Sequence, residues 1–221
     1  MLHVAHHDDL RSPELGAIPT SNWLSPLRRH ARAYLMMNVI FYGVYLLGMA
    51  VVLLDPPMQG RLNDQIRREL NTGPMAIVAH AYESGNVLAA ILLTFVVNLL
   101  IGCIVTMSLP STLIPFAGIA AGAWRAALWG VMLSPVAPEH GLAILPHHLN
   151  SVLEGQAYVL AMLAAYRQGR WVFPTTTCHR GEIWGDGFLD TLRLYRLIIP
   201  MLAFAAVYEA VEVIYLAPLL K

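Results

Sequence analysis

Three charged side chains stand inside long apolar runs of the sequence: Arg125, Glu154 and Glu209. A charged group at the centre of a bilayer costs about 2.5–3.5 kcal/mol on insertion scales. Because an arginine fork can bind a carboxylate through two hydrogen bonds, we expect Arg125 to pair with one or both glutamates inside a helical bundle. Such a cluster would either clasp helices together or relay protons, and the clasp is the interpretation we favour.

Further polar residues stand at helical spacing around these charges. His147, Asn150, Ser151 and Glu154 occupy positions i, i+3, i+4 and i+7, so one helical face carries all four. A face of that kind packs against other helices and not against lipid. The predicted buried polar and ionic cluster consists of Arg125, Glu154, Glu209, Glu212, Asn98, His147 and Asn150.

The same side chains raise the question of a metal ion or a catalytic site. His147 shares its face with Glu154, and imidazole and carboxylate are ligands of divalent ions. The sequence has no H-E-x-x-H motif and no paired E-x-x-H spacing, so we predict no metal. It also has no Walker loop, no Rossmann fingerprint, no G-x-S-x-G and no C-x-x-C. We therefore predict a protein that is not an enzyme and carries no cofactor.

The composition defines the class of protein that must position these residues. The chain has 221 residues, of which 57% are hydrophobic and 13% charged. A soluble domain has about 45–50% apolar and about 25% charged residues, so too few charges remain for a water-facing surface. The formal net charge of zero offers no basic surface for nucleic acid. The fold class predicted is all-α, a polytopic transmembrane helical bundle.

Five apolar segments have the length that a membrane span needs, which is about 20 residues. Residues 1–30 are polar and predict an N-terminal arm, and residues 31–221 predict a single transmembrane domain. The predicted spans are 33–54, 86–107, 111–133, 146–166 and 198–216.

Three connections between the spans carry predictions of their own. Within residues 58–85, apolar residues recur every four positions at Leu62, Ile66 and Leu70. This is typical of a short interfacial helix on the membrane and equally of a solvated helix packed on the protein. The apolar run 142–145 is too short to cross a bilayer, and a re-entrant segment over 142–148 is one interpretation of it. Residues 167–191 are polar and predict a loop.

The third predicted span carries small residues at every fourth position. Gly118, Gly122, Ala126 and Gly130 form this ridge, which allows another helix backbone to come close. The ridge predicts a helix-packing surface next to Arg125.

The arginines predict the orientation, because cytoplasmic segments are enriched in Lys and Arg. With five spans and a cytoplasmic N-terminus, nine basic residues lie inside and four outside, with the C-terminus outside. The inner set is Arg11, Arg28, Arg29, Arg32, Arg167, Arg170, Arg180, Arg193 and Arg196, and the outer set is Arg61, Arg67, Arg68 and Lys221.

Four short motifs together resemble a known family. They are Asn86 followed by an apolar run, the glycine-ridged IPFAGIAAGAW, the junction APEHGLAILP, and the closing segment AAVYEAVEVIYLAP. In order and size over roughly residues 30–220 they resemble the stage II sporulation protein M (SpoIIM) family of integral membrane proteins. The resemblance implies a non-enzymatic membrane component, since the named sporulation members are scaffolds for a complex that remodels peptidoglycan.

Two functions follow from these patterns. The first is a membrane scaffold or accessory subunit of a complex in the inner (cytoplasmic) membrane. Its partners would be the lipid bilayer and other membrane proteins, a second copy of the chain among the options, and no nucleic acid. The alternative is a small transporter or proton/ion conduit that uses the buried Arg–Glu cluster.

Overall fold

The structure is a computed structural model that describes residues 27–28, 30–72, 75–135, 144–172 and 180–220. Most of the predicted N-terminal arm, and residues 142–143 of the predicted re-entrant segment, lie outside these residues. The rest of that segment, from Ile144 onwards, belongs to a long helix.

Every regular element in the described residues is helical, as the all-α prediction requires. The first part of the chain forms α2 (Ala31–Leu54), α3 (Pro57–Thr72), α4 (Ala76–Glu83), α5 (Val87–Val97), the π-helix η1 (Asn98–Ser108) and α6 (Leu109–Leu113). The second part forms α7 (Ala117–Met132), α8 (Ile144–Val172), α9 (Arg180–Val211), the π-helix η3 (Glu212–Leu216) and the 3-10 turn η4 (Ala217–Leu219).

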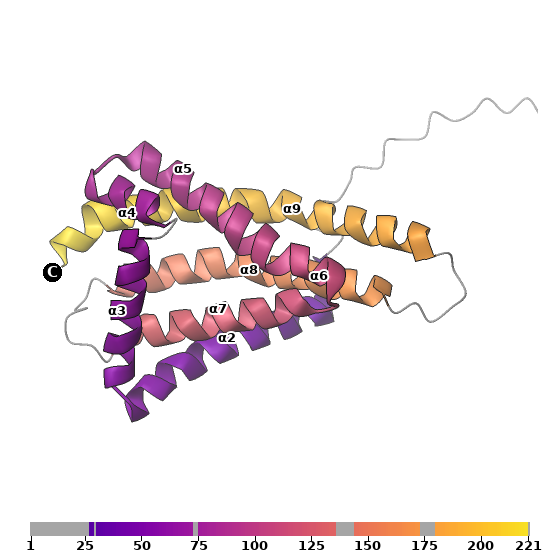
Figure 1. Cartoon of the computed structure of the whole chain (residues 1–221), viewed down its shortest axis with the longest axis horizontal. Helices are drawn as coiled ribbons and strands as arrows, with labels where there is room; N and C mark the ends of the chain where they lie inside the picture. The colour runs from indigo at the N-terminus through magenta and orange to yellow at the C-terminus, as the bar shows by residue number, and fades with distance from the viewer. Residues whose placement is uncertain (1–26, 29, 73–74, 136–143, 173–179, 221) are drawn as a thin grey trace, which may run out of the picture.

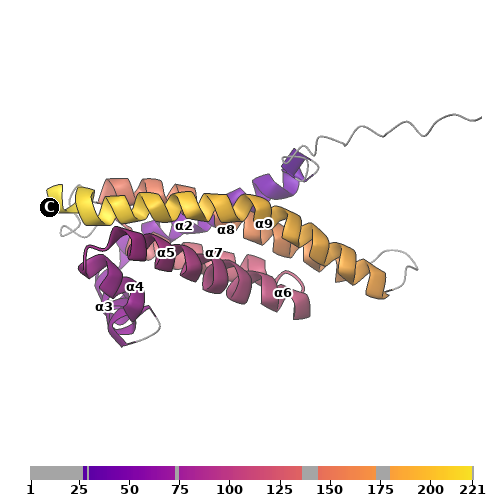
Figure 2. The same ribbon diagram turned by 90° about the horizontal axis from the view of Figure 1, so that it is seen from above.

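The long helices lie roughly side by side, and α3 crosses one end of them (Figures 1 and 2). The chain alternates in direction through α2, the α5–η1–α6 rod, α7, α8 and α9. As a result α3, α4 and the C-terminus gather at one end of the bundle, here called the α3 end. The beginning of α2, the α6–α7 turn and the beginning of α9 lie at the opposite end.

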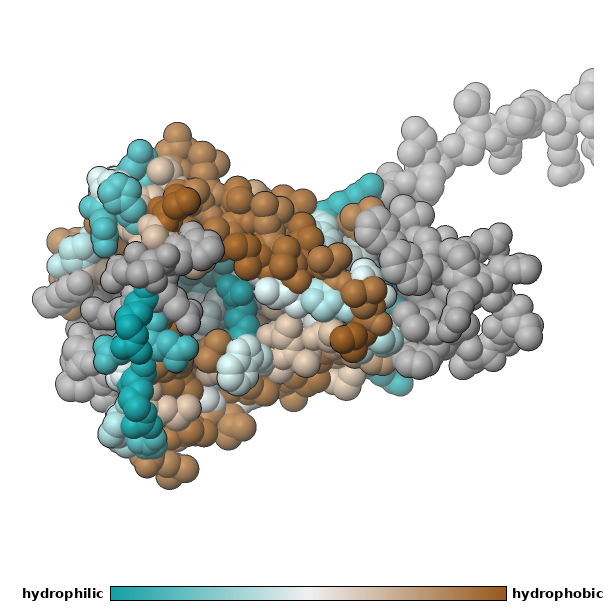
Figure 3. All heavy atoms as spheres, in the orientation of Figure 1, coloured by the Kyte–Doolittle hydropathy of each residue, from teal (hydrophilic) through white to brown (hydrophobic). Residues whose placement is uncertain are grey.

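Three helical rods are long and apolar enough to cross a membrane: Ala31–Leu54, Val87–Leu113 and Thr191–Leu219. They support the prediction of a membrane protein, and apolar side chains cover much of the face shown in Figure 3. The third and fourth predicted spans, 111–133 and 146–166, are not confirmed by length and composition. α7 has only 16 residues, and α8 is enclosed by the other helices, with every residue from Ala157 to Ala165 at most 2% exposed. A helix that is surrounded by other helices does not face lipid, so its outer surface need not be apolar.

The turn between the second and third predicted spans lies later than the sequence suggested. The second rod runs through Pro110 as far as Leu113, and the chain turns at residues 114–116. Ile114 is extended, as a residue before proline prefers to be, and Phe116 has a left-handed φ of 67°. Buried Ser111 fastens the turn, since its Oγ donates to the Met107 carbonyl (2.7 Å) and accepts from the Gly118 N–H (2.8 Å).

The predicted loop over 167–191 was wrong for most of its length. α8 continues to Val172, and α9 is already helical from Arg180. Polar composition alone does not exclude a helix, since a helix presents polar and apolar residues on different faces.

The connection 58–85 forms two helices, and the first is docked on the bundle. Gln59 of α3 is buried, and its Nε2 donates to the carbonyl oxygens of Met132 (3.0 Å) and Ser134 (2.8 Å) at the end of α7. These carbonyls have no partner inside their own helix, so Gln59 satisfies them. The helix predicted here is therefore present, and its relation to the membrane surface stays a prediction.

The small-residue ridge of α7 is used inside the chain. Gly118, Gly122, Ala126 and Gly130 are all buried. A Cβ at Gly130 would collide with the backbone of α2 at Tyr45 and Gly48, and one at Gly122 would meet the Met162 side chain of α8 at 2.5 Å. The ridge therefore brings α2 and α8 against α7.

Candidate functional site

A cavity of about 260 Å³ opens between the helices near the α3 end of the bundle. Six of the seven residues predicted to form a buried polar cluster line it, although they come from four different rods. Figure 3 shows hydrophilic atoms recessed beside the apolar surface of α5, next to α3. The lining consists of Ile66, Met75, Val78, Thr94, Val97, Asn98, Arg125, Trp129, Met132, Leu133, His147, Asn150, Ser151, Glu154 and Glu209.

Arg125 enters the cavity from the middle of α7 and lies on aromatic rings. Its Cζ is 4.3 Å from the centre of the Tyr158 ring and 5.6 Å from that of Trp129. Its Nη2 approaches Asn98 Oδ1 at 3.5 Å, a long and weak hydrogen bond. A guanidinium over an aromatic face gains cation–π attraction of up to about 2 kcal/mol when it is desolvated.

The predicted direct ion pair between Arg125 and a glutamate was wrong. Within the described residues, no carboxylate oxygen lies within 4.0 Å of the Arg125 nitrogens. Tyr158 lies between the two charged groups. The guanidinium lies over its ring, and its hydroxyl donates to Glu154 Oε1 at 2.6 Å. Arg125 and Glu154 therefore both contact Tyr158 and do not form a direct ion pair.

Gly102 of η1 leaves the space that Tyr158 occupies. A Cβ at this position would lie 2.9 Å from the Tyr158 hydroxyl oxygen and 3.3 Å from Arg125 Nη1. The absence of a side chain at Gly102 therefore allows the Arg125–Tyr158–Glu154 arrangement to fit against the second rod.

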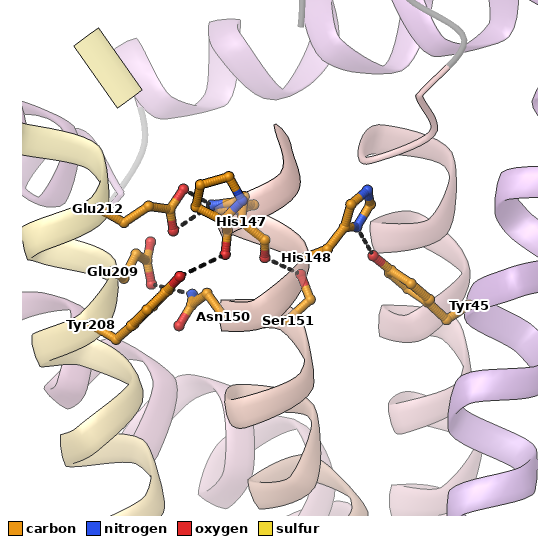
Figure 4. Close-up of polar contacts among 9 residues, drawn as sticks. Tyr45, His147, His148, Asn150, Ser151, Tyr208, Glu209 and Glu212 are labelled. Atoms are coloured by element: carbon orange, nitrogen blue, oxygen red, sulfur yellow. Dashed lines mark hydrogen bonds and ion pairs between the residues drawn. The ribbon is translucent and has the colours of Figure 1, made fainter. Parts of the chain in front are cut away.

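The seventh predicted residue, Glu212, lies beside the cavity and binds His147 (Figure 4). His147 Nδ1 is 3.1 Å from Glu212 Oε1 and 3.3 Å from Oε2, and Glu212 is buried. Tyr208 joins the same two helices by donating to the Pro146 carbonyl at 3.1 Å. The start of α8 is thereby tied to the end of α9.

Glu209 and Asn150 meet one helical turn deeper, again as Figure 4 shows. Asn150 Nδ2 donates to Glu209 Oε2 at 3.2 Å. Asn150 is only 2% exposed, and its Oδ1 has no hydrogen-bond partner. The buried Nε of Arg125 also lacks a partner. The cavity therefore presents a free acceptor and a free donor, which water or a polar solute would satisfy.

Tyr82 of α4 contacts Thr94, a residue of α5 that lines the cavity. Its hydroxyl shares a hydrogen bond of 2.9 Å with Thr94 Oγ1. Burial raises the pKa of Tyr82 above its ordinary value, and the negative charge of Glu209 raises it further. A residue of the short connecting helix α4 is thus electrostatically coupled to α9.

Both π-helical segments begin at residues of the site. η1 begins at Asn98, which lines the cavity, and η3 begins at Glu212, which binds His147. π-helical turns are rare and are frequently found at functional sites.

On the side away from α3 the cavity meets a layer of fully buried apolar side chains. This layer is formed by Cys103 and Met107 of η1, Met162 and Leu163 of α8, and Leu194 and Ile198 of α9, all 0% exposed. Among the described residues, this layer separates the cavity from the opposite end of the bundle.

The described residues contain no group of three or more His, Cys, Asp or Glu side chains that could hold a metal ion. His148 points away from the cavity, and its Nδ1 shares a hydrogen bond of 2.8 Å with the Tyr45 hydroxyl of α2. What the arrangement offers chemically is one cation, carboxylates and amides around a small volume.

Sequence reasoning missed Tyr158 as part of the site. The signal was present, since Tyr158 follows Glu154 by four residues and so lies on the same helical face. Trp129, which follows Arg125 by four residues, also belongs to the aromatic surface beneath the guanidinium.

Comparison of the chain with protein-family models, with curated proteins and with solved structures found no match.

Proposed function

We propose that the protein is a small membrane transporter in which the cavity between α5, α7, α8 and α9 binds a small polar or charged species, protons included. The observation that carries the proposal is the convergence of Arg125, Glu154, Glu209 and His147 on one cavity inside an apolar bundle. Ionisable groups at such depth are costly and usually mark ion or substrate pathways.

Two features support a transporter over an open channel. The cavity holds polar atoms without partners, which suits a site that is filled in use. The apolar layer at Met107 and Met162 closes the side away from α3. A site with one closed side fits a protein that exposes its cavity alternately to the two faces of the membrane.

The proposal includes five spans with the N-terminus in the cytoplasm. The alternating course of α2, the α5–η1–α6 rod, α7, α8 and α9 favours it (Figure 1). α7 is about 24 Å long at 1.5 Å per residue, so it requires some local thinning of the bilayer. The arginines of the end opposite α3 favour a cytoplasmic location for that end.

A scaffold role, as the SpoIIM resemblance implies, is the competing proposal. It requires a surface for a partner, whereas the small-residue ridge of α7 is already filled by α2 and α8. We therefore rank the scaffold second, and the family assignment stays a prediction from the motifs.

Flux measurements on proteoliposomes separate the two functions. The purified chain is reconstituted with a pH-sensitive dye inside the vesicles, and proton flux is recorded under an imposed gradient. A transporter should lose most flux in Glu154→Gln and Glu209→Gln, while membrane abundance and thermal stability stay close to the wild type. Glu83→Gln is the matched control, because Glu83 lies on the exposed surface of α4.

Two results would contradict the hypothesis that the protein transports protons. Wild-type protein without flux above empty vesicles, in both gradient directions, excludes protons as the transported species. If wild-type vesicles show no proton flux and both glutamate variants lose membrane abundance, the scaffold function is favoured.

A further inference from the structure

A second site lies at the end of the bundle opposite α3, where arginines from two distant parts of the chain meet. Arg28 lies three residues before α2, Arg32 lies in its first turn, and Arg170 lies near the end of α8. Together with Tyr166 they line a pocket of about 380 Å³. Figure 1 shows these two helix ends at the same end of the molecule.

The three arginines are available to an anion. All three are exposed, and none has a carboxylate within 4.0 Å among the described residues. Arginine binds phosphate through two parallel hydrogen bonds, so three such side chains around one pocket match a phosphate group well.

An apolar groove begins where the basic pocket ends. It has a volume of about 410 Å³ and runs between α2, α8 and α9. Leu27 of the groove directly precedes Arg28, and Tyr34 follows Arg32 by two residues. The lining residues are Leu27, Tyr34, Leu153, Leu160, Leu197, Pro200, Met201 and Phe204.

The groove leads away from the arginines toward the middle of the bundle. Leu160 and Leu153 lie on the same helix as Arg170, about 1.7 and 3.6 turns deeper than the pocket residue Tyr166. From Leu160 to Leu153 the helix covers about 10 Å. Arg28 and Arg32 flank the start of the apolar rod Ala31–Leu54, which places them at the level of lipid headgroups.

We propose that the pocket and the groove together bind one anionic phospholipid, with its phosphate on Arg28, Arg32 and Arg170 and an acyl chain along the groove. Charge complementarity selects an anionic headgroup, and the continuous apolar groove selects a lipid over a free anion. Basic pockets between transmembrane helices bind anionic headgroups in this manner. The inference is independent of the proposed transport function.

Native mass spectrometry of the full chain in a neutral detergent tests the proposal. Phosphatidylglycerol, phosphatidylcholine and inorganic phosphate are added separately, and bound ligand and melting temperature are recorded. We expect one phosphatidylglycerol per chain with a raised melting temperature, weaker binding of phosphatidylcholine, and no protection by inorganic phosphate.

Two sets of variants, one in the basic pocket and one in the groove, locate the site. Arg32→Gln and Arg170→Gln should each weaken phosphatidylglycerol binding about fivefold, whereas Arg61→Gln, an exposed arginine of the α3 end, should not. Met201→Trp fills the groove and should also weaken lipid binding, while Val207→Trp on the same helix, outside the groove, should not.

The proposal is overturned by any of three results. These are equal affinity for the two phospholipids, protection by inorganic phosphate equal to that by phosphatidylglycerol, or the same loss of binding in Arg61→Gln as in Arg32→Gln.

Discussion

The guanidinium carbon of Arg125 lies 4.3 Å from the centre of the Tyr158 ring, and the hydroxyl of that ring donates to Glu154 at 2.6 Å. One side chain therefore separates a cation from an anion inside an apolar bundle. The arrangement keeps the guanidinium on the cavity surface, where a direct ion pair would have consumed its hydrogen-bonding capacity.

Tyr158→Phe tests the hydroxyl half of this contact. The variant retains the ring beneath Arg125 but leaves the buried Glu154 carboxyl without its donor. We expect a loss of about 1–3 kcal/mol in the free energy of unfolding. Tyr158→Leu should lose more, because it also removes the aromatic face beneath the guanidinium. The measurement is thermal or denaturant unfolding in detergent, and equal stability of Tyr158→Phe and the wild type would refute the contact.

Gly130→Val tests the close approach of α2 and α7. A side chain at Gly130 meets the α2 backbone at Tyr45 and Gly48, and backbone cannot move aside as a flexible side chain can. We expect a loss of several kcal/mol or a failure to accumulate, since overpacking alone costs about 1–3 kcal/mol. Gly43→Val is the control on α2, because nothing lies within 4 Å of a Cβ there. Similar melting temperatures for the two variants would mean that the helices do not meet at Gly130.

Ser111→Ala tests the turn between α6 and α7. Ser111 is fully buried, and its hydroxyl both donates to Met107 and accepts from the Gly118 N–H. Removing it leaves two buried backbone groups without partners, and we expect a loss of about 1–3 kcal/mol. Thr112→Ala, which removes a hydroxyl exposed at the surface, should change the unfolding free energy by less than about 0.5 kcal/mol. The turn assignment fails if Thr112→Ala is the more damaging of the two.

The pH titration of Tyr82 tests the coupling between α4 and α9. Because burial and the charge of Glu209 raise the pKa of Tyr82, its neutral form is favoured in the folded state. An unfolded tyrosine ionises near pH 10.0, so the stability that this group contributes is complete below that pH and is lost as the pH rises above it. Tyr82→Phe should remove this part of the alkaline loss.

Glu209→Gln should lower the pKa of Tyr82 only in part, because burial, the larger cause, remains. The measurement is absorbance at the phenolate band, taken as the difference between chains with and without Tyr82→Phe. An unchanged Tyr82 midpoint in Glu209→Gln would show that α4 does not lie near α9.

Helical periodicity predicted much of the site, and its limits have physical causes. Spacing within one helix placed His147, Asn150 and Glu154 on a common face, and all three line the cavity. Spacing along one helix carries no information about distances between side chains of different helices. It could therefore not show that Tyr158 lies between Arg125 and Glu154.

Hydropathy likewise found the three apolar rods but misplaced some boundaries. The predicted spans left residues 108–110 for the turn, yet the chain turns at residues 114–116, where Pro115 holds Ile114 extended. Hydropathy also predicted a loop where α8 and α9 continue as helices, because it measures the solvent that a residue prefers and not the backbone it adopts.

The water accessibility of two neighbouring valines tests the central claim most directly. Val97 lines the cavity, whereas Val96 lies on the apolar outer surface of the second rod. Each is replaced by cysteine in a chain that carries Cys103→Ala and Cys178→Ala, and each is treated in membranes with a charged, water-soluble thiol reagent and with a lipid-soluble one. The account predicts that the charged reagent labels Val97→Cys and not Val96→Cys, which reacts only with the lipid-soluble reagent. Labelling of Val96→Cys alone by the charged reagent would contradict it.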